Sequence, residues 1–424
     1  MFGTTDPTLQ QPDIDYAPNE EKWRARTERR LKTETLGTEL PKGFPRKLSS
    51  PLVWDGQTLQ EDSHKWTYKL SCGDLEEIDQ ALRHFQGLKR PMGYVSPETF
   101  PLPNLHTKLR EVSNELHNGR GFKIVRGLPV DKYTREENVI IYAGLSAHVA
   151  PMRARQGIGG SSQAVLSHVK DLSKTDEKEY IGIGTYTSEL LTFHTDLGDI
   201  VSLLCLEPAA EGGASQLASS WHIYNHLAST RPDLIQTLAE DWPHDTFGAG
   251  RYAYKMRPVL HYQPTTASTP ERVIIHCVRR NFTGAHASPR TQGIPPLTEA
   301  QAEALDTLHF LAQRFQLRLD FRKGDIQYIN NLSLLHAREA YTDSPEQQRH
   351  LIRLWLRDPQ LAWEVPEPMK QTHSLVYDNV DPNTQVFPLE PSVLSGRSQG
   401  HKIPQPAKSV VLDEATNGPI VNLD

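Results

Sequence analysis

The stretch TFHTDLGDI places His194 and Asp196 two residues apart between two apolar runs. In an extended chain residues i and i+2 project to the same side, so these two side chains can approach one point while Thr195 faces away. Imidazole and carboxylate are both ligands that proteins offer to metal ions. The pair alone is a weak signal, because a chain with 18 histidines contains such pairs by chance. A metal site needs a third ligand from elsewhere in the chain.

His336 supplies a candidate third ligand. It ends the segment GDIQYINNLSLLH, which reads as a turn, a strand, an Asn330-Asn331 turn and an apolar run. An imidazole from this distant strand would give a metal two histidines and one carboxylate on one face and leave its other face open. That arrangement suits non-heme Fe(II) oxygen chemistry. The alternative is zinc, which with three such ligands and a water would hydrolyse a substrate.

Two arginines follow His336 on one strand. In RHLIRLWLRD, Arg349 and Arg353 alternate with apolar residues, so they share one face of an otherwise apolar element. A buried guanidinium needs an anionic partner, and its fork matches a carboxylate bidentately. Taken alone, an internal ion pair with Asp or Glu explains these arginines best. Beside a metal triad, an anionic ligand becomes the better explanation.

The rest of the middle of the chain mixes helices and strands without regular alternation, which favours an antiparallel barrel or jelly roll decorated by helices. Histidines within apolar runs, namely His168, His261 and His276, are expected to be satisfied core residues. Helices are expected after Asp74 with a capping box to Glu77, from Leu105 to Asn118, over TREENVIIYAGLSAHV, around His222 to Glu240, and after Thr298. Strands are expected at FKIVRGLPV, AVLSHV, VSLLCLE, SQLASS, YAYKMRPVLHY, RVIIHCV, GDIQYIN and RHLIRLWLRD.

Composition predicts three parts. Residues 1–65 are polar and Pro-rich and form an extension that is partly irregular; its charged run EEKWRARTERRLK is expected to be at most a helix with a solvated face. Residues 66–362 carry the catalytic domain with its N-terminal helices. Residues 363–424 are again Pro-rich, so few packed elements are expected there.

The charge balance narrows the class of protein. The 46 Lys and Arg against 52 Asp and Glu give a net charge of −6 with no basic stripe, which argues against nucleic acid and membrane as partners. Three widely spaced cysteines fit a reducing compartment. The first residues lack the pattern of a signal peptide, so a cytoplasmic location is expected. Oligomeric state cannot be read from these features.

The ordered segments FHTD, GGASQL, GDIQYINNLSLLHAREAY and RHLIRLWLRD resemble the taurine dioxygenase and clavaminate synthase branch of the Fe(II)/2-oxoglutarate-dependent oxygenases, in its fungal form. The resemblance covers about residues 163–358. It implies a double-stranded β-helix with iron at one open end, held by His194, Asp196 and His336. It also implies 2-oxoglutarate and O2 as co-substrates.

The resemblance assigns roles to three further residues. Arg349 matches the arginine that binds the far carboxylate of 2-oxoglutarate. Ser215 stands where relatives carry a threonine that helps to hold this co-substrate, and Arg353 matches a second arginine that faces the co-substrate or an anionic substrate. The implied reaction oxidises an unactivated C–H bond of a small, amino-acid-like or anionic metabolite by hydroxylation, desaturation or cyclisation, with release of succinate and CO2. A zinc hydrolase using the same three ligands is the rival function, and a non-catalytic binding protein on the same scaffold is a third.

Overall fold

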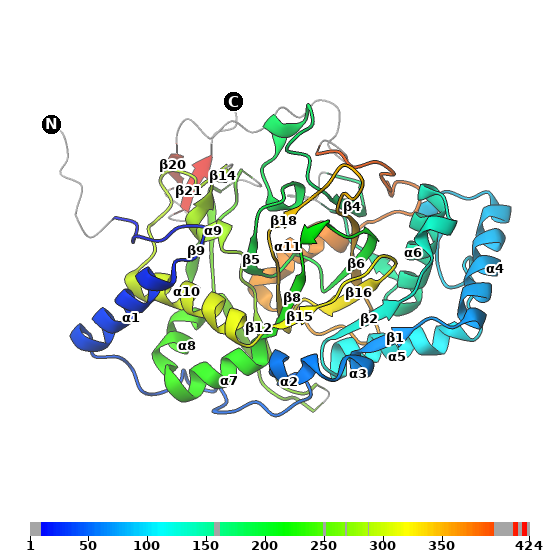
Figure 1. The fold of residues 1–424 in the computed structure, drawn as a ribbon. Coiled ribbons are helices and arrows are strands. Elements are labelled where there is room, and N and C mark those ends of the chain that lie inside the picture. The colour runs from blue at the N-terminus through cyan, green and yellow to red at the C-terminus, as the bar shows by residue number, and fades with distance from the viewer. Residues whose placement is uncertain are drawn as a thin grey trace.

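Two β-sheets form the centre of the molecule in the computed structural model, which describes residues 10–156, 162–248, 252–267, 269–286 and 288–393 and the backbone of Val410–Asp413 and Gly418–Val421 (Figure 1). The larger sheet has the order β1-β2-β16-β6-β19-β3, with β4 also paired to β19, and the smaller sheet has the order β15-β8-β17-β5. The strands of the larger sheet are β1 (Thr67–Lys69), β2 (Phe122–Arg126), β3 (Met152–Arg153), β4 (Leu166–Val169), β6 (Ile200–Glu207), β16 (Ile326–Asn330) and β19 (His350–Arg357). Those of the smaller sheet are β5 (Leu191–His194), β8 (Ser215–Ser219), β15 (Leu317–Leu319) and β17 (Leu334–Arg338).

The two sheets pack face to face. One buried cluster contains Phe122, Val201 and Trp355 from the larger sheet together with Leu217 and Leu334 from the smaller one. Strand pairing is antiparallel within both sheets except between β1 and β2. This is the double-stranded β-helix, or jelly roll, that the sequence predicts.

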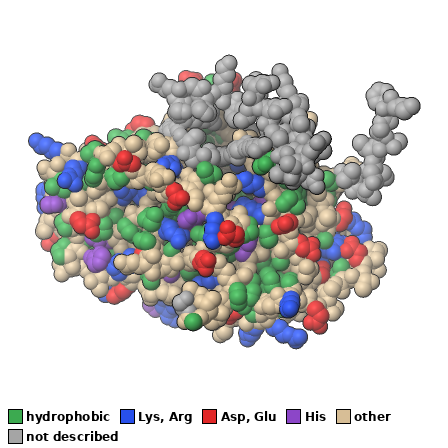
Figure 2. All heavy atoms as spheres, turned by 180° about the vertical axis from the view of Figure 1, so that it is seen from behind, with side chains coloured by type: hydrophobic (Ala, Val, Ile, Leu, Met, Phe, Trp, Pro, Cys, Tyr) green, Lys and Arg blue, Asp and Glu red, His purple; other side chains and the backbone are tan. Residues whose placement is uncertain are grey.

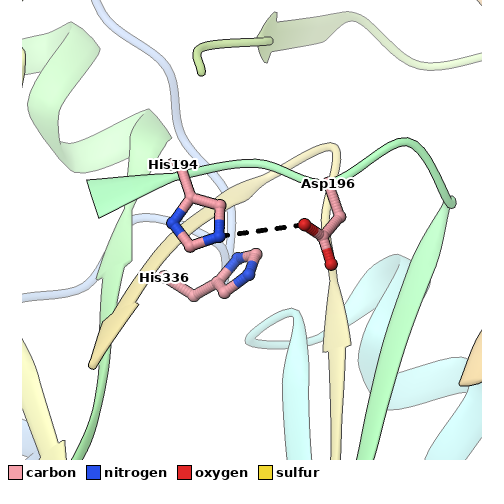
Figure 3. Close-up of side chains that lie close together, drawn as sticks. All are labelled: His194, Asp196 and His336. Atoms are coloured by element: carbon pink, nitrogen blue, oxygen red, sulfur yellow. Dashed lines mark ion pairs between the residues drawn. The ribbon is translucent and has the colours of Figure 1, made fainter. Parts of the chain in front are cut away.

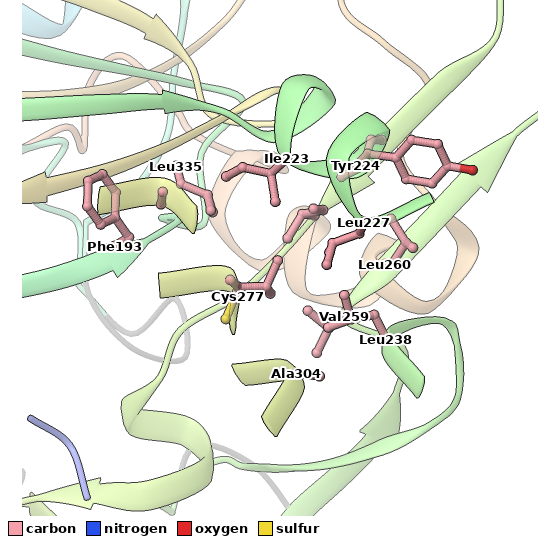
Figure 4. Packing of buried hydrophobic residues seen from close by; sticks show 14 of the residues in the cluster. Phe193, Ile223, Tyr224, Leu227, Leu238, Val259, Leu260, Cys277, Ala304 and Leu335 are labelled. Atoms are coloured by element: carbon pink, nitrogen blue, oxygen red, sulfur yellow. The ribbon is translucent and has the colours of Figure 1, made fainter. Parts of the chain in front are cut away.

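The alternation of strand β17 decides which of its residues enter the space between the sheets. Leu335 and Ala337 belong to the cluster on the outer face of the smaller sheet, where Phe193 of β5 joins them, and Figure 4 shows Phe193 and Leu335 within it. Because successive side chains of a strand point to opposite faces, His336 and Arg338 point inward. His336 and Arg338 therefore share the inner face of β17 because side chains alternate along a strand.

Helices cover the outer face of each sheet. Side chains of α4, α5 and α6 pack on the larger sheet, and those of α7, α8 and α10 pack on the smaller one. The helices are α1 (Glu20–Thr33), α2 (Gly56–Gln60), α3 (Ser63–Trp66), α4 (Cys72–Leu88), α5 (Leu105–Asn118), α6 (Arg135–Val149), α7 (Ser220–Thr230), α8 (Pro232–Ala239), α9 (Arg280–Thr283), α10 (Glu299–Arg314) and α11 (Glu367–Tyr377). The short 3-10 turns are η2 (Met92–Tyr94), η3 (Val130–Lys132), η5 (Lys178–Tyr180) and η6 (Gly184–Tyr186).

Short two-stranded sheets complete the fold. They are formed by β7 (Glu211–Gly212) with β18 (Tyr341–Thr342), β9 (Trp242–Asp245) with β10 (Tyr254–Arg257), β11 (Leu260–Gln263) with β12 (Arg272–Ile275), β13 (Gly284–Ala285) with β14 (Ser288–Pro289), and β20 (Val410–Asp413) with β21 (Gly418–Val421). Two details differ from expectation. The capping box of α4 runs from Ser71 to Asp74 and not from Asp74 to Glu77, and the helix expected from His222 to Glu240 is divided at Pro232.

Helix α1 corrects the expectation of a solvated charged face. Arg26 and Arg30 are each only 4% exposed. Arg26 binds Asp306 at 2.9 Å and Glu299 at 3.0 Å, and Arg30 binds Glu303. The three carboxylates lie on α10, so the charged run docks the N-terminal segment onto the helix that covers the smaller sheet.

Helix α11 shows that the segment after Glu364 is packed as well. Val376 and Tyr377 are buried. The Tyr377 hydroxyl donates to the carbonyl oxygen of Leu356 at 2.8 Å and accepts the backbone N–H of Asp199 at 3.0 Å. The C-terminal segment thus reaches the loop that carries Asp196. The division of the chain at residues 65 and 362 stays a prediction.

A buried histidine pair joins β4 to β19. His168 Nδ1 lies 2.8 Å from His350 Nε2, and burial lowers the pKa of His168 to about 4 and that of His350 to about 2. Below pH 6.5 these two histidines are protonated in the unfolded chain but stay neutral in the folded chain. The free energy of unfolding therefore falls as the pH drops from 6.5 toward 4. We expect His350→Gln to make this fall shallower by about 1.4 kcal/mol per pH unit. Urea unfolding at pH 7, 6 and 5 measures how the free energy of unfolding depends on pH. His64→Gln, which replaces an exposed histidine, is the control. If His350→Gln showed the same pH dependence as the native protein, the depressed pKa of His350 would be contradicted.

The surface carries charges of both signs. In the face shown in Figure 2, blue and red side chains are interspersed and do not gather into a patch of one sign. Over the described part of the chain, no helix has the length and apolar character needed to cross a bilayer. The cytoplasmic location remains a prediction.

Candidate metal centre and co-substrate site

The three predicted metal ligands lie close together (Figure 3). His194 ends β5, Asp196 follows it in the loop to β6, and His336 lies in the middle of β17, where it is the register partner of His194. One ligand atom of each residue lies within 4.8 Å of the others. His194 Nε2 is 3.8 Å from Asp196 Oδ1, and the two imidazole rings are 4.2 Å apart between centroids.

Hydrogen bonds fix how two of these ligands point. His194 Nδ1 lies 2.8 Å from the carbonyl oxygen of Thr192, so Nε2 is the nitrogen left for a metal. Asp196 Oδ2 accepts the indole N–H of Trp355 at 2.8 Å and a guanidinium N–H of Arg353 at 3.0 Å. The other oxygen, Oδ1, is the one that faces His194. The carboxylate is therefore presented to a metal through a single oxygen.

The protonation states of Asp196 and His336 favour a bound cation. Burial opposes ionisation of Asp196, yet Arg353 and the two imidazoles hold its pKa well below its usual range, so the carboxylate is charged at neutral pH. Burial lowers the pKa of His336 to about 3, which leaves this imidazole neutral and able to donate its lone pair. His336 Nδ1 is buried and has no hydrogen-bond partner among the described residues. This donor set of two nitrogens and one oxygen fits Fe(II).

Asn331 and Gly198 shape the loop that carries Asp196. Asn331 accepts the backbone N–H of Asp196 at 2.8 Å and donates to the carbonyl oxygens of Asp196 and Gly198 at 2.8 and 2.7 Å. A Cβ atom at Gly198 would lie 2.5 Å from Cβ of Trp355, so only glycine allows this close approach. The Asn-Asn turn before β17 thus holds the second ligand while β17 carries the third.

We expect Trp355→Phe to weaken iron binding about 10-fold to 100-fold, because it removes the N–H that holds Asp196 Oδ2 and keeps most of the ring packing. Anaerobic titration with Fe(II) measures the affinity. Trp54→Phe is the matched control, because it removes a buried indole hydrogen bond to Arg120 that lies outside the site. Equal iron affinity in Trp355→Phe and the native protein would show that the indole does not position the ligand.

Arg349 provides the candidate co-substrate anchor. Its side chain is 4% exposed, and its Nη1 atom is buried without a hydrogen-bond partner among the described residues. Its backbone N–H donates to Asp343, its guanidinium lies 5.2 Å from the centre of the Tyr341 ring, and burial lowers its pKa. Gly213 has φ +69°, and a Cβ there would lie 3.1 Å from Nε of Arg349. A buried cation without an anion is costly, so this geometry fits the carboxylate of 2-oxoglutarate.

The structure places the other two predicted co-substrate residues in different surroundings. The Ser215 hydroxyl donates to Oε1 of Gln327 at 3.0 Å. Arg353 donates to Asp196 and, at 3.2 Å, to Gln156. Contacts of Ser215 and Arg353 with 2-oxoglutarate stay predictions.

Arg338 is a site residue that the sequence interpretation missed. It is 4% exposed, and Nη2 donates to the carbonyl oxygens of Thr187, at 2.8 Å, and Glu189. Its Nε and Nη1 atoms are buried without partners among the described residues. The signal that could have found it is its position two residues after His336 on the same face of β17. Trp355 and Asn331 were likewise not singled out.

Comparison with known proteins identifies the family. Residues 85–355 match the family described as Taurine catabolism dioxygenase TauD, TfdA family. The chain belongs to the TauD/TfdA family. A taurine hydroxylase-like protein, SAT17 of Stachybotrys chartarum, is 40% identical over 330 residues, which cover 76% of this chain and 82% of that protein. FR-33289 synthase of Streptomyces rubellomurinus is 28% identical over 313 residues, covering 72% and 88% of the two chains.

A solved structure supports the fold of this TauD/TfdA dioxygenase. Asparagine oxygenase in complex with Fe(II), 3-hydroxyasparagine and succinate superposes with a TM-score of 0.51 at 17% identity, covering 69% of this chain and 93% of that one. The resemblance and fold class predicted from the sequence are thereby confirmed. As a member of the family, the protein is a non-heme iron dioxygenase that uses Fe(II), 2-oxoglutarate and O2. The zinc hydrolase alternative finds no support in these comparisons.

Proposed function

We propose that this dioxygenase oxidises an unactivated C–H bond of a small, amino-acid-like or anionic metabolite, with conversion of 2-oxoglutarate to succinate and CO2. The observations that carry the proposal are the convergence of His194, Asp196 and His336 and the burial of Arg349, whose Nη1 lacks a partner among the described residues. Iron and 2-oxoglutarate together supply the oxidising power for such a bond when they are bound. The likeness of the 40% identical relative to taurine hydroxylase, by its name, supports a small substrate with an anionic group.

The chain's own contribution is binding, orientation and exclusion of water. Asp196 is held in one orientation by Trp355 and Arg353, and His194 is held by Thr192. Arg349 fixes the end of the co-substrate that does not react. Whether the product is hydroxylated, desaturated or cyclised depends on the placement of one C–H bond and is a matter for product analysis.

The decisive experiment screens small metabolites for stimulation of succinate formation. The purified protein is supplied with Fe(II), ascorbate, 2-oxoglutarate and O2, and succinate and products are followed by mass spectrometry. We expect succinate to form in step with an oxidised metabolite and only when oxygen is present. Turnover of a metabolite that persists without oxygen, or with zinc in place of iron, would reject the oxygenase function.

A further inference from the structure

Arg338 is a buried cation whose hydrogen-bonding capacity is mostly unused. It is 4% exposed, and of its three nitrogen atoms only Nη2 has acceptors, the carbonyl oxygens of Thr187 and Glu189. Its Nε and Nη1 atoms are buried without partners among the described residues. A guanidinium carries N–H donors on all three nitrogens, so the donors on two of them meet no protein acceptor.

Arg153 shows that a buried arginine of this chain can be satisfied without a carboxylate. Its Nε, Nη1 and Nη2 atoms donate to Gln385 and to the carbonyl oxygens of Val95 and Gly93, at 2.8 to 2.9 Å. Burial lowers the pKa of both Arg153 and Arg338 to about 10, so burial alone does not distinguish the two residues. The difference is that two nitrogen atoms of Arg338 have no acceptor.

A second buried guanidinium with an unpartnered atom lies close to Arg338. The guanidinium carbons of Arg338 and Arg349 lie 4.9 and 5.2 Å from the centre of the same Tyr341 ring, so both cations contact one aromatic side chain. After burial, the charge of Arg349 is the next cause of the lowered pKa of Arg338. Nη1 of Arg349 and the hydroxyl of Tyr341 are also buried without hydrogen-bond partners among the described residues. Three neighbouring side chains therefore share this deficit.

Two neighbouring buried cations require an anion. The Tyr341 ring attracts a cation only weakly and offers it no hydrogen-bond acceptor in its face. A carboxylate has two oxygens with about four lone-pair sites, so a single carboxylate can bind two guanidinium groups at once. Arg338 follows the metal ligand His336 by two residues on the inner face of β17, which is about 7 Å along the strand. That distance suits a five-carbon diacid with its other end at the metal.

Arg338 also holds residues 187–189, which lie just before β5. Its Nη2 atom donates to the carbonyl oxygens of Thr187, at 2.8 Å, and of Glu189. Strand β5 begins two residues after Glu189 and ends at the metal ligand His194. An anion that fixes the guanidinium of Arg338 therefore also restrains the chain that leads to this ligand.

We propose that Arg338 binds the far carboxylate of 2-oxoglutarate together with Arg349 and thereby ties residues 187–189 to the bound co-substrate. The inference rests on the proposed function and deepens it, because it assigns a second residue to the co-substrate. Charge-assisted hydrogen bonds from two guanidinium groups make the site selective for 2-oxo acids with a second carboxylate.

The test compares 2-oxoglutarate with 2-oxopentanoate, which carries a methyl group in place of the far carboxylate. The protein is loaded with Fe(II) under nitrogen, and equilibrium dialysis with labelled 2-oxoglutarate, alone and in competition with 2-oxopentanoate, gives both affinities. With two guanidinium groups on one carboxylate, we expect the native protein to prefer 2-oxoglutarate about 1,000-fold or more. A general disturbance of the site weakens both acids alike, so the ratio of the two affinities isolates the far carboxylate.

Three variants assign the preference. Arg338→Gln is expected to lower it at least about tenfold. Arg280→Gln is the matched control and should keep it, because Arg280 also donates to a backbone carbonyl ahead of β5, that of Gly182 at 2.8 Å. An unchanged preference in Arg338→Gln would overturn the proposal. If Arg338→Gln fails to fold, Arg349→Gln decides: with Arg338 intact it should still prefer 2-oxoglutarate about tenfold, and loss of all preference would overturn the proposal.

Hydrogen exchange provides a readout that does not depend on affinity. In the anaerobic Fe(II) protein, saturation with 2-oxoglutarate should slow amide exchange in residues 187–190 several-fold more than saturation with 2-oxopentanoate, and Arg338→Gln should abolish the difference. Equal exchange with the two acids in the native protein would overturn the link to this segment. Failure of the native protein to bind 2-oxoglutarate would reject the proposed function and the inference with it, whereas an unchanged preference in Arg338→Gln would reject the inference alone.

Discussion

Replacing His336 with glutamine is expected to deprive the protein of stably bound iron and to abolish succinate formation. The variant removes one of three ligands that lie within 4.8 Å of one another and nearly preserves the volume of the side chain. Loss of a residue that only supports a ligand costs about 10-fold to 100-fold in metal affinity, so loss of the ligand itself should cost more than about 100-fold. Iron content after gel filtration and anaerobic Fe(II) titration measure the effect.

His309→Gln is the matched control for this variant. His309 is a partly buried histidine on α10, and burial lowers its pKa to about 4, but it packs against Phe193 on the outer side of the smaller sheet. It should keep its iron and its activity. Retention of one equivalent of iron by His336→Gln, with affinity equal to that of the native protein, would show that the three side chains do not form the metal site.

The convergence of His194, Asp196 and His336 could be predicted in part from the sequence, because it depends on short-range geometry. His194 and Asp196 are two residues apart at the end of a strand, His336 lies within β17, and Arg349 directly precedes β19. Once β17 is recognised, alternation turns His336 inward. The same reasoning predicts the two-sheet fold, since short apolar strands of this kind need a second sheet to cover them.

Contacts that depend on distant partners could not be predicted in this way. The run containing Arg26 and Arg30 looks like a solvated helix face until the acidic residues of α10, about 270 positions later, are brought beside it. Likewise, no residue near Trp355 in the sequence indicates that its indole would hold Asp196. Burial of a charge is a property of the assembled fold.

Arg353 illustrates the same limit within the site itself. Arg353 lies on β19 as the alternation predicts, but only the packed structure shows that it donates to Asp196 and Gln156. Two arginines four residues apart thus have different surroundings, because the side chain of Arg353 meets a protein carboxylate and Nη1 of Arg349 has no partner among the described residues. The difference makes Arg349 the sharper test of co-substrate binding.

Arg349→Gln is expected to raise the concentration of 2-oxoglutarate required for half-maximal turnover by about 100-fold or more. The variant leaves a buried carboxylate without its charged partner, and such a loss costs about 2 to 5 kcal/mol. Succinate formation as a function of 2-oxoglutarate concentration gives KM and kcat separately, and anaerobic equilibrium dialysis with labelled 2-oxoglutarate gives the affinity directly. Iron affinity should change little, because Arg349 is not one of the ligands.

Two further variants separate binding of the carboxylate from a general loss of charge. Arg349→Lys keeps the positive charge but replaces a planar fork with a compact ammonium group, so its KM for 2-oxoglutarate should lie between those of the native protein and Arg349→Gln. Arg318→Gln removes an arginine whose side chain is 59% exposed and whose partner is Glu339, and it should leave the KM unchanged. If Arg349→Gln bound 2-oxoglutarate as the native protein does, the unpaired Nη1 of Arg349 would have to serve another anion, and the co-substrate would have to be anchored elsewhere between the sheets.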